Sequence, residues 1–493
     1  MAYSWRVRDV GRERLAITSK TASPSARRLE NMHRPWIWLV AAVIGCGDDA
    51  LKPDASPQVD APRPDAAPDA FVPVGDCPFD PAAASGALRT AFGDQGRLSI
   101  NPSPYVDSIE FAMLLDGDDI YIGGGDRSGG IDDSQLHLEK RNRCTGALVP
   151  SFGAGGVVTE NVGTADDAVG PAALVAGSLY LVGAESVMVP DFAWRIEKRS
   201  AATGALDPSF GVGGAVTHNP SGMVDVALFA VVDTQHIYVV GFDSAAGPSD
   251  QAWRIEKRRL SDGGLDEGFG TGGLIVNNPS AGRDMVSAVA IHDGFLYIVG
   301  NDAVPGDDQW RIEKRSVIDG GLVTGFGTDG VVTVNPSPGP ERVQAIAIAP
   351  PHMYITGLEG VAFGDFALRI EKRLLSDGSL VPSFGSAGTV TTNPSPSVDR
   401  FRDIALDDNA LYVTGFDYSA GGVDAQWRIE KRSLSDGALV SGFGTGGVVT
   451  ENFGDGDEWA FQILVDSSSV YVFGDYPVAA PDDYGWHLQR RAK

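Results

Sequence analysis

Acidic side chains recur in this sequence at fixed distances from two landmarks, a tyrosine and a charged hexapeptide. Six copies place a carboxylate five residues after the tyrosine, and the seventh places Asp475 beside Tyr476. A further aspartate lies six residues before the position of the hexapeptide's glutamate in all seven copies. In chain order the pairs are Asp126 and Asp133, Glu185 and Asp191, Asp243 and Asp250, Asp302 and Asp307, Glu359 and Asp365, Asp417 and Asp424, and Asp475 and Asp483.

Oxygen ligands suit a hard cation, so a Ca²⁺ site at these carboxylates is one interpretation. The other is that the aspartates cap tight turns through backbone amides. Recurrence in every copy favours turn capping, because a ligand site is usually unique. A third acidic set precedes another predicted strand of the repeat: Asp107, Asp167, Asp225, Asp284, Glu341, Asp399 and Glu458.

No catalytic set accompanies these carboxylates. His218, His236, His292 and His352 are scattered, without metal-ligand spacing. The sequence has no Gly-x-Ser-x-Gly nucleophile motif, no phosphate-binding loop and no dinucleotide fingerprint opening a helix. We therefore expect a binding protein and not an enzyme.

The charged hexapeptide marks seven copies of one unit. Trp-Arg-Ile-Glu-Lys-Arg occupies 194–199 and returns unchanged at 253–258, 310–315 and 427–432, with substitutions at 136–141, 368–373 and 486–491. Alternating side chains predict a strand with one charged face. Its charges form either a basic stripe for an acidic partner or a ladder of ion pairs between packed sheets. A glutamate interrupts the basic positions in six of the seven copies, which favours the ladder.

Each unit opens with Gly-x-Leu and continues through Phe-Gly, a short strand, an alternating apolar strand, a Tyr-x-x-Gly strand and the charged strand. The units begin at 86, 146, 204, 263, 320, 378 and 437. Four short strands with glycine-rich turns predict a blade, and seven blades predict an all-β, seven-bladed β-propeller. A β-solenoid is the alternative, but it would need capped ends.

The order of the strands predicts how the ring closes. The chain enters in the strand after Phe-Gly, near 97–100, and leaves after the last charged strand, near 491. The N-terminal strand is therefore expected to complete the last blade, which removes the exposed sheet edges.

Residues 206–217, Leu-Asp-Pro-Ser-Phe-Gly-Val-Gly-Gly-Ala-Val-Thr, resemble the delta-60 repeat family of bacterial β-propeller-like proteins. The resemblance covers 86–493, and the leucine, Phe-Gly and following glycine occur in all seven copies. It implies a fold and little about activity.

The N-terminal region resembles a bacterial lipoprotein signal, with a short basic region, an apolar core and Val43-Ile44-Gly45-Cys46. The resemblance implies that Cys46 is diacylated, and Gly47 favours the outer membrane. The apolar run is shorter than the ~20 residues that span a bilayer. We expect 1–45 to be an extension and signal peptide, 46–76 a disordered Pro/Asp/Ala-rich tether, and 77–493 the propeller.

Two further cysteines precede the first two repeats. In an exported, oxidising setting Cys77 and Cys144 are the only possible pair, so we expect a disulfide. Two free thiols are the alternative.

Charge and loop length narrow the partners. The chain has 39 Lys and Arg against 65 Asp and Glu, a net charge of −26, which argues against nucleic acid. Length varies most between the Tyr strand and the charged strand, where repeat proteins often place recognition. Aromatic residues in these loops are candidates to stack on a sugar or pack on a protein: Phe242, Phe363, Phe416, Tyr418, Tyr476 and Tyr484.

We expect a monomeric lipoprotein, periplasmic or exposed at the cell surface, that binds a protein or carbohydrate through this acidic loop face. A propeller lyase or hydrolase with its site in the central mouth is one alternative. A structural envelope protein is the other.

Overall fold

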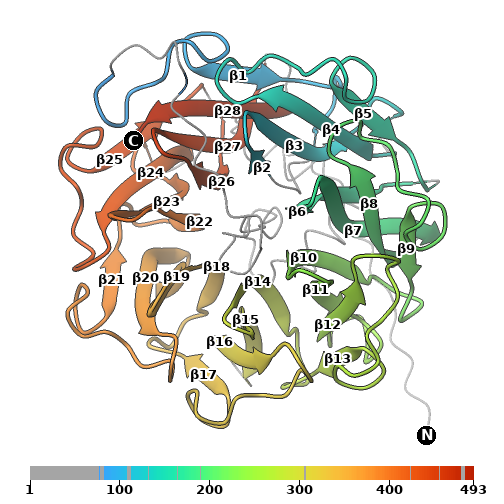
Figure 1. Cartoon of the computed structure of the whole chain (residues 1–493). Coiled ribbons are helices and arrows are strands. Elements are labelled where there is room, and N and C mark those ends of the chain that lie inside the picture. The colour runs from blue at the N-terminus through green and yellow to red at the C-terminus, as the bar shows by residue number, and fades with distance from the viewer. Residues whose placement is uncertain are drawn as a thin grey trace, which may run out of the picture.

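The computed structural model of the chain is a ring of seven four-stranded antiparallel sheets around a central axis (Figure 1). This confirms the predicted all-β, seven-bladed propeller. The structure describes residue 77 and residues 83–107, 113–130, 133–163, 165–188, 190–304, 307–421, 424–454, 456–478 and 483–493. The predicted signal peptide, Cys46 and the tether lie outside the described residues. Within those residues no helix is long and apolar enough to cross a bilayer.

Each blade has an inner, a second, a charged and an outer strand, and blades are numbered 1 to 7 by their inner strands. The inner strands are β2 (Met113–Asp116), β6 (Ala168–Val175), β10 (Val226–Val232), β14 (Met285–His292), β18 (Arg342–Ala349), β22 (Arg400–Leu406) and β26 (Ala460–Val465). The second strands are β3 (Asp119–Asp126), β7 (Ser178–Met188), β11 (His236–Asp243), β15 (Phe295–Val304), β19 (His352–Ala362), β23 (Ala410–Asp417) and β27 (Ser469–Pro477). The charged strands are β4 (Gln135–Asn142), β8 (Asp191–Ser200), β12 (Ala252–Arg259), β16 (Asp307–Ser316), β20 (Asp365–Leu374), β24 (Gln426–Ser433) and β28 (Tyr484–Ala492). The outer strands are β5 (Val157–Glu160), β9 (Ala215–His218), β13 (Leu274–Asn277), β17 (Val331–Val334), β21 (Thr389–Thr392), β25 (Val448–Glu451) and, for blade 7, β1 (Arg97–Ile100).

The N-terminal strand closes the ring, as predicted. β1 pairs antiparallel with β28, with Arg97 opposite Gln489, and becomes the outer strand of blade 7. Ahead of β1, the amide of Gly86 donates to the carbonyl of Ala492 at 2.8 Å. Chain segments nearly 400 residues apart in sequence thus form one sheet.

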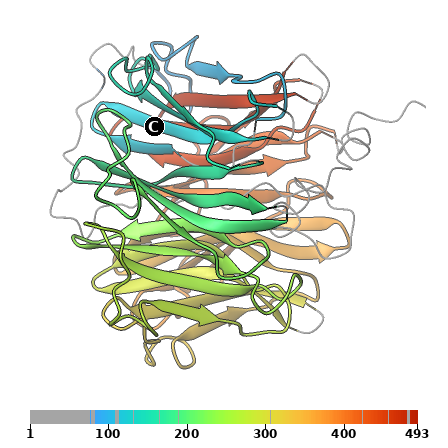
Figure 2. The same ribbon diagram turned by 90° about the vertical axis from the view of Figure 1, so that its right-hand side faces the viewer.

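Alternating strand directions sort the connections to two ends of the ring, which Figure 2 shows edge-on. The mouth end has the loops between second and charged strands and the loops from each outer strand to the next inner strand. The base end has the turns between inner and second strands and the Phe-Gly segments between charged and outer strands.

The repeated aromatic residues build the core within and between blades. Tyr180 meets the fully buried Phe210 of the same blade edge-to-face, with ring centroids 5.8 Å apart. Trp194 of blade 2 packs against Gly241 of blade 3, where an added Cβ would lie 3.0 Å from the indole. The indole N–H also donates to the carbonyl of Phe242 at 3.0 Å. The carbonyl oxygen of Val226 in the adjacent inner strand would lie closer still, 2.1 Å from that Cβ, so strand pairing and the indole both require glycine here.

Candidate functional site

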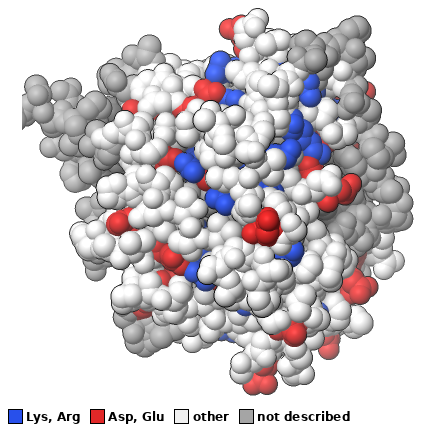
Figure 3. Space-filling view, turned by 90° about the vertical axis from the view of Figure 1, so that its left-hand side faces the viewer, with Lys and Arg blue, Asp and Glu red and all other residues white. Residues whose placement is uncertain are grey.

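The charged strands carry ladders of ion pairs, as predicted. In blade 2, Glu197 accepts from Nε of Arg195 and of Arg199, both at 2.6 Å. Arg199 also contacts Glu160 of blade 1, so the ladder joins adjacent blades. The interpretation as a basic stripe is wrong, because the motif's glutamate is fully buried in these copies: Glu197, Glu256, Glu313, Glu371 and Glu430. On one side of the ring, Figure 3 shows basic and acidic side chains interspersed.

The predicted carboxylates that follow the tyrosine extend these ladders toward the mouth end. In blade 2, Arg195 donates to Glu185 at 2.6 Å. The equivalent carboxylates of five other blades contact the equivalent basic residue of their own charged strand: Asp126, Asp243, Asp302, Glu359 and Asp417. Asp475 of blade 7 instead accepts the backbone amide of Trp459 at 2.6 Å.

The predicted aspartates that precede the charged strand are held by an asparagine just after, or at the end of, the outer strand. Asn219 donates to Asp191 at 3.1 Å. The same bond recurs in the other blades, with acceptors Asp133, Asp250, Asp307, Asp365, Asp424 and Asp483 and donors Asn161, Asn278, Asn335, Asn393, Asn452 and Asn101. Sequence reasoning missed this pairing, although the asparagine recurs in all seven copies.

The third acidic set anchors the mouth-end loops. Asp225 accepts from the amide and hydroxyl of Ser221, before the inner strand, and from the amide of Ser244, after the second strand. It therefore ties the two mouth-end loops of blade 3 together. Burial raises the pKa of every carboxyl group in this set, that of Asp399 to about 6 and that of Glu458 to about 9.

The contacts of the first two acidic sets involve the same carboxylates that the sequence predicts as possible Ca²⁺ ligands. Among the described residues, no group of three or more His, Cys, Asp or Glu is arranged to hold a metal ion. Every one of the fourteen carboxylates predicted as ligands has an arginine, histidine, asparagine or amide partner in the protein. Their geometry is that of structural ties between strands and loops.

Some loop aromatics predicted to face a ligand are buried instead. Phe242, Phe416 and Tyr418 have exposed fractions of 0, 4 and 7%. Phe242 and Phe416 are still in their second strands, four residues after the tyrosine, and so share its buried face. Phe363, between β19 and β20, is 87% exposed.

The inner strands differ from one another at their mouth end. Each inner strand follows a buried carboxylate of the third acidic set, such as Asp399 in blade 6. The second residue after this carboxylate packs between blades, as Phe401 does. The first and third residues flank it on the inner strand, and in blades 3 to 7 the third lies at a shift in register with the second strand. In blades 2 to 4 these are Ala168, Gly170, Val226, Leu228, Met285 and Ser287. In blades 5 to 7 they are Arg342, Gln344, Arg400, Arg402, Trp459 and Phe461, here called the mouth cluster.

Arg402 is the most enclosed member of the mouth cluster. It is 2% exposed. Burial lowers its pKa to about 9, although Asp475 opposes the shift, and the nearby Arg342 adds to it. Its guanidinium lies 5.6, 5.9 and 5.4 Å from three ring centroids, those of Phe416, Trp459 and Phe461. A desolvated cation is thus held among aromatic faces.

A strand irregularity accompanies this arginine. The register between β22 and β23 shifts between Phe401 and Asp403, and such a bulge re-aims the side chains around it. Asp403 accepts the amides of Ile404 and Ile463, both at 2.8 Å. Burial raises its pKa to about 8. Asp403 therefore fastens the bulge of blade 6 to blade 7.

Sequence reasoning did not single out the mouth cluster. The available signal was a comparison of the copies position by position. The start of the inner strand is described for blades 2 to 7. At the positions of the mouth cluster, blades 2 to 4 have small or aliphatic side chains, and blades 5 to 7 have charged, amide or aromatic ones.

Two histidines replace the first arginine of the charged strand, and their neighbours give them opposite charge states. Burial lowers the pKa of His137, but hydrogen bonds with Asp126 and Glu139 outweigh it and raise the pKa to about 9. In blade 7 the motif has Gln489 in place of glutamate. There, burial and two nearby arginines lower the pKa of His487 to about 3.

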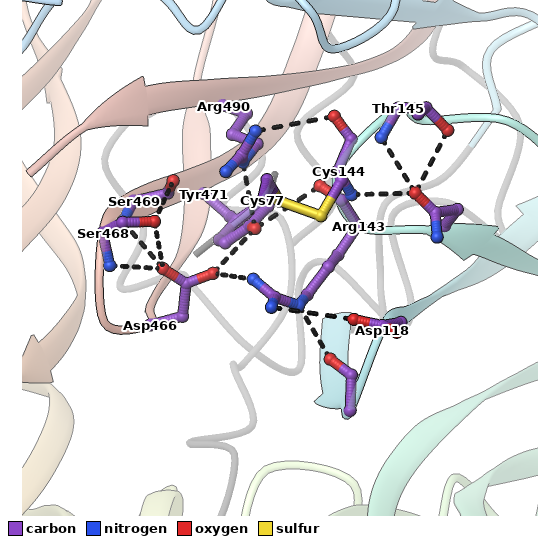
Figure 4. The surroundings of a disulfide bond; sticks show 12 residues. Cys77, Asp118, Arg143, Cys144, Thr145, Asp466, Ser468, Ser469, Tyr471 and Arg490 are labelled. Carbon is purple, nitrogen blue, oxygen red and sulfur yellow. Dashed lines mark hydrogen bonds and ion pairs between the residues drawn. A yellow bond between two sulfur atoms is a disulfide. The ribbon is translucent and has the colours of Figure 1, made fainter. Parts of the chain in front are cut away.

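Cys77 and Cys144 are joined by a disulfide at the base end, with Cα atoms 5.5 Å apart (Figure 4). Cys144 lies in the turn after the charged strand of blade 1.

Comparisons with known proteins give no family for this chain. No family model and no curated protein matches it. A solved polysaccharide lyase, Uly1, is 10% identical with a TM-score of 0.41, over 89% of this chain and 97% of that one. Drosophila Plexin A, in complex with Semaphorin 1b, is 8% identical with a TM-score of 0.40, over 83% and 88%. A subtype N10 neuraminidase-like protein of A/little yellow-shouldered bat/Guatemala/060/2010 is 9% identical with a TM-score of 0.36, over 64% and 92%. These likenesses carry no argument about function.

Proposed function

We propose that this protein is a binding module that holds an anionic ligand at the mouth cluster. The observation that carries the proposal is the placement of Arg342, Arg400 and Arg402 on the inner strands of two adjacent blades. Guanidinium groups bind carboxylate, sulfate or phosphate through paired hydrogen bonds. The same positions in blades 2 to 4 have small, aliphatic or hydroxyl side chains, so the architecture alone does not require arginine there.

The electrostatics of the cluster favour an anion. Arg400 is 5% exposed, and a charge removed from water gains most from a nearby opposite charge. Burial lowers the pKa of Arg402 more than the attraction of Asp475 raises it. Further negative charge in the mouth would therefore stabilise the charged form of this arginine. Burial also raises the pKa of Glu341 to about 7 and that of Glu458 to about 9, which lowers the negative charge that competes with a ligand.

Two other candidates have less support. A cation or basic partner at the acidic loop face would have to displace the arginine and asparagine partners of those carboxylates. An enzyme with its site in the mouth would need a group free to move a proton. Asp403 has the pKa for this role, but both of its carboxylate oxygens accept backbone amides.

For the localisation, we propose that a lipid on Cys46 anchors the protein outside the cytoplasm and that residues 46–76 connect this anchor to the propeller. The support is the sequence motif. Cys46→Ser is expected to release the protein from the membrane fraction, and full retention of that variant would refute the anchor.

The binding proposal is tested by calorimetric titration with citrate as a tricarboxylate probe. We expect the unmodified protein to bind citrate and to show no heat beyond dilution with glycerol. Arg342→Gln and Arg400→Gln should each weaken citrate binding at least about ten-fold, because a charged hydrogen bond contributes ~1.5–3 kcal/mol.

Arg259→Gln is the matched control. Arg259 lies at the base end with 46% of its side chain exposed, so the same change there should leave citrate binding intact. Each variant is first checked for parental circular dichroism and melting temperature. Equal citrate affinity in the mouth variants and the control would reject the mouth cluster as the site.

A further inference from the structure

At three interfaces between adjacent blades, a tyrosine and a lysine donate to one carbonyl of the next blade. From blade 1 to blade 2, the Tyr121 hydroxyl and Lys140 Nζ donate to the carbonyl of Ala201 at 2.8 and 3.0 Å. From blade 4 to blade 5, Tyr297 and Lys314 donate to Leu375 at 3.2 and 2.8 Å. Between blades 2 and 3 the bond comes from Tyr180, and between blades 3 and 4 from Lys257. One or both donors thus link five pairs of adjacent blades at the base end.

The closing interface, between blades 7 and 1, departs from this pattern. Tyr471 and Arg490 occupy the donor positions, and their bonds are long, 3.4 Å to the carbonyl of Arg143 and 3.5 Å to that of Cys144. Within the described residues, Nε1 of Trp486 has no hydrogen-bond partner. The equivalent indoles of blades 2, 3 and 6 donate to the next blade, whereas that of Trp310 in blade 4 has no partner within the described residues either. The contacts that the repeat normally supplies are therefore weaker here.

The closing interface also has a buried ion pair (Figure 4). Arg143, 1% exposed, contacts Asp466 of blade 7 and donates to the carbonyl of Gly117 at 2.7 Å. Asp466 also accepts the hydroxyl of Tyr471 at 2.9 Å. Blades 2 to 6 have apolar residues at the position of Arg143: Ala201, Leu260, Val317, Leu375 and Leu434. Blade 7 has Lys493 there, which pairs with Asp407 of blade 6 at 2.9 Å, so this kind of ion pair joins blade 7 to both of its neighbours. Removing one partner of such a pair leaves an uncompensated buried charge, so the pair stabilises the closed interface.

The disulfide crosses the same interface. Downstream of Cys77 the chain joins blade 7, where Gly86 pairs with Ala492, whereas Cys144 belongs to blade 1. The main chain crosses the closing interface at the mouth end, between β1 and β2. The Cys77–Cys144 bond adds a second covalent crossing at the base end, beside the Arg143 and Asp466 pair.

We propose that the Cys77–Cys144 disulfide is a redox-controlled latch on the closing interface, and that its reduction loosens blade 7 and weakens ligand binding at the mouth cluster. The second part rests on the proposed function. Blade 7 contributes Trp459 and Phe461 to that cluster, and both rings lie against Arg402. Movement of this blade therefore disturbs the site directly.

The reducing partner is a dithiol. Its thiolate attacks Sγ of Cys144, which is partly exposed, while Cys77 is 5% exposed. The S–S bond breaks and Cys77 leaves as a thiolate. The second thiol of the reductant then resolves the mixed disulfide, which frees Cys144 and leaves the reductant oxidised by two electrons.

The latch is tested by hydrogen exchange with mass spectrometry on the full chain, oxidised and after dithiothreitol. Reduction should accelerate amide exchange in β1, β28 and β2 and leave β11 to β15 unchanged. A Cys77→Ser/Cys144→Ser variant should behave like the reduced protein with or without dithiothreitol. Reduction should also weaken citrate binding about ten-fold, a typical coupling between sites.

The outcomes separate the two proposals. Unchanged exchange, or an even rise across all blades, overturns the latch. Accelerated exchange with unchanged citrate affinity overturns the link to the mouth, provided that Arg400→Gln abolishes citrate binding in the same preparation. If the oxidised protein binds no citrate, the anionic-ligand function fails, and exchange alone decides the latch.

Discussion

At the scale of single residues, the charge of a side chain depends on which repeat it occupies. His137 and His487 hold the same place in their blades, yet the first has a pKa of about 9 and the second about 3. Blade 1 keeps Asp126 and Glu139 as partners. Blade 7 has Gln489 instead and adds two arginines nearby, so a proton there has no compensating charge.

His137 gives a prediction with a defined pH dependence. Its pKa is raised in the folded protein from 6.5 to about 9, so the stability it contributes is complete below pH 6.5 and lost as pH rises through 9. Arginine stays charged over this range. The His137→Arg variant should therefore match the parent in free energy of unfolding at pH 6 and exceed it at pH 10 by about 3 kcal/mol. Urea denaturation at both pH values measures the difference, and an offset that does not change with pH would contradict the argument.

Residues that repeat could be predicted from the sequence, and residues that depart from the repeat could not. The charged motif returns seven times, and its buried ion pairs follow from alternation. The bonds from Asn219 to Asp191 and its equivalents join residues 28 apart in sequence in blades 1 to 6, and 382 apart in blade 7, and neither spacing nor composition links them. Arg400 and Arg402 look like ordinary surface charges in the sequence, but the structure buries them on the inner strand of blade 6, with Arg402 against rings of blade 7.

At the scale of elements, packing between blades fixes which positions accept only glycine. Gly300 of blade 4 faces the indole of Trp253 from blade 3, and its own strand neighbour supplies a backbone oxygen. In blades 2 to 7 the nearest atom is such a backbone oxygen, so the Tyr-x-x-Gly motif reflects strand pairing within a blade first and the indole of another blade second. Neither contact could be read from the sequence, although the motif itself could.

Gly300→Ala should be strongly destabilising. The new Cβ would lie 2.6 Å from Trp253 and 2.1 Å from the carbonyl oxygen of Met285, so strand and indole must both shift. Overpacking of this kind costs about 3 kcal/mol. Gly222→Ala is the control, because nothing lies within 4 Å of its Cβ position. Chemical denaturation should show a loss for the first variant alone, and equal stability of the two would mean that the blade interface relaxes freely.

At the scale of the whole molecule, seven similar blades hold one another only if the ring closes. The topology was predictable because the repeat begins with an outer strand and ends with a charged strand. The reinforcement of the closing interface was not, because Arg143 and Asp466 are 323 residues apart and blades 2 to 7 have no arginine at the position of Arg143. The ring is therefore closed by the strand order that all repeats share, together with the ion pair between Arg143 of blade 1 and Asp466 of blade 7.

Deleting 86–101 tests closure directly. The deletion removes β1, uncovers the backbone of β28, and takes away Phe92, which is fully buried against Tyr471. An open strand edge promotes pairing between molecules. We expect a lower melting temperature together with oligomers in sedimentation velocity. A deletion of 1–75 keeps both β1 and Cys77, and it should melt like the parent as a monomer. If the 86–101 deletion also melts like the parent and stays monomeric, blade 7 is stable without its outer strand, and the ring does not depend on the contact between its two ends.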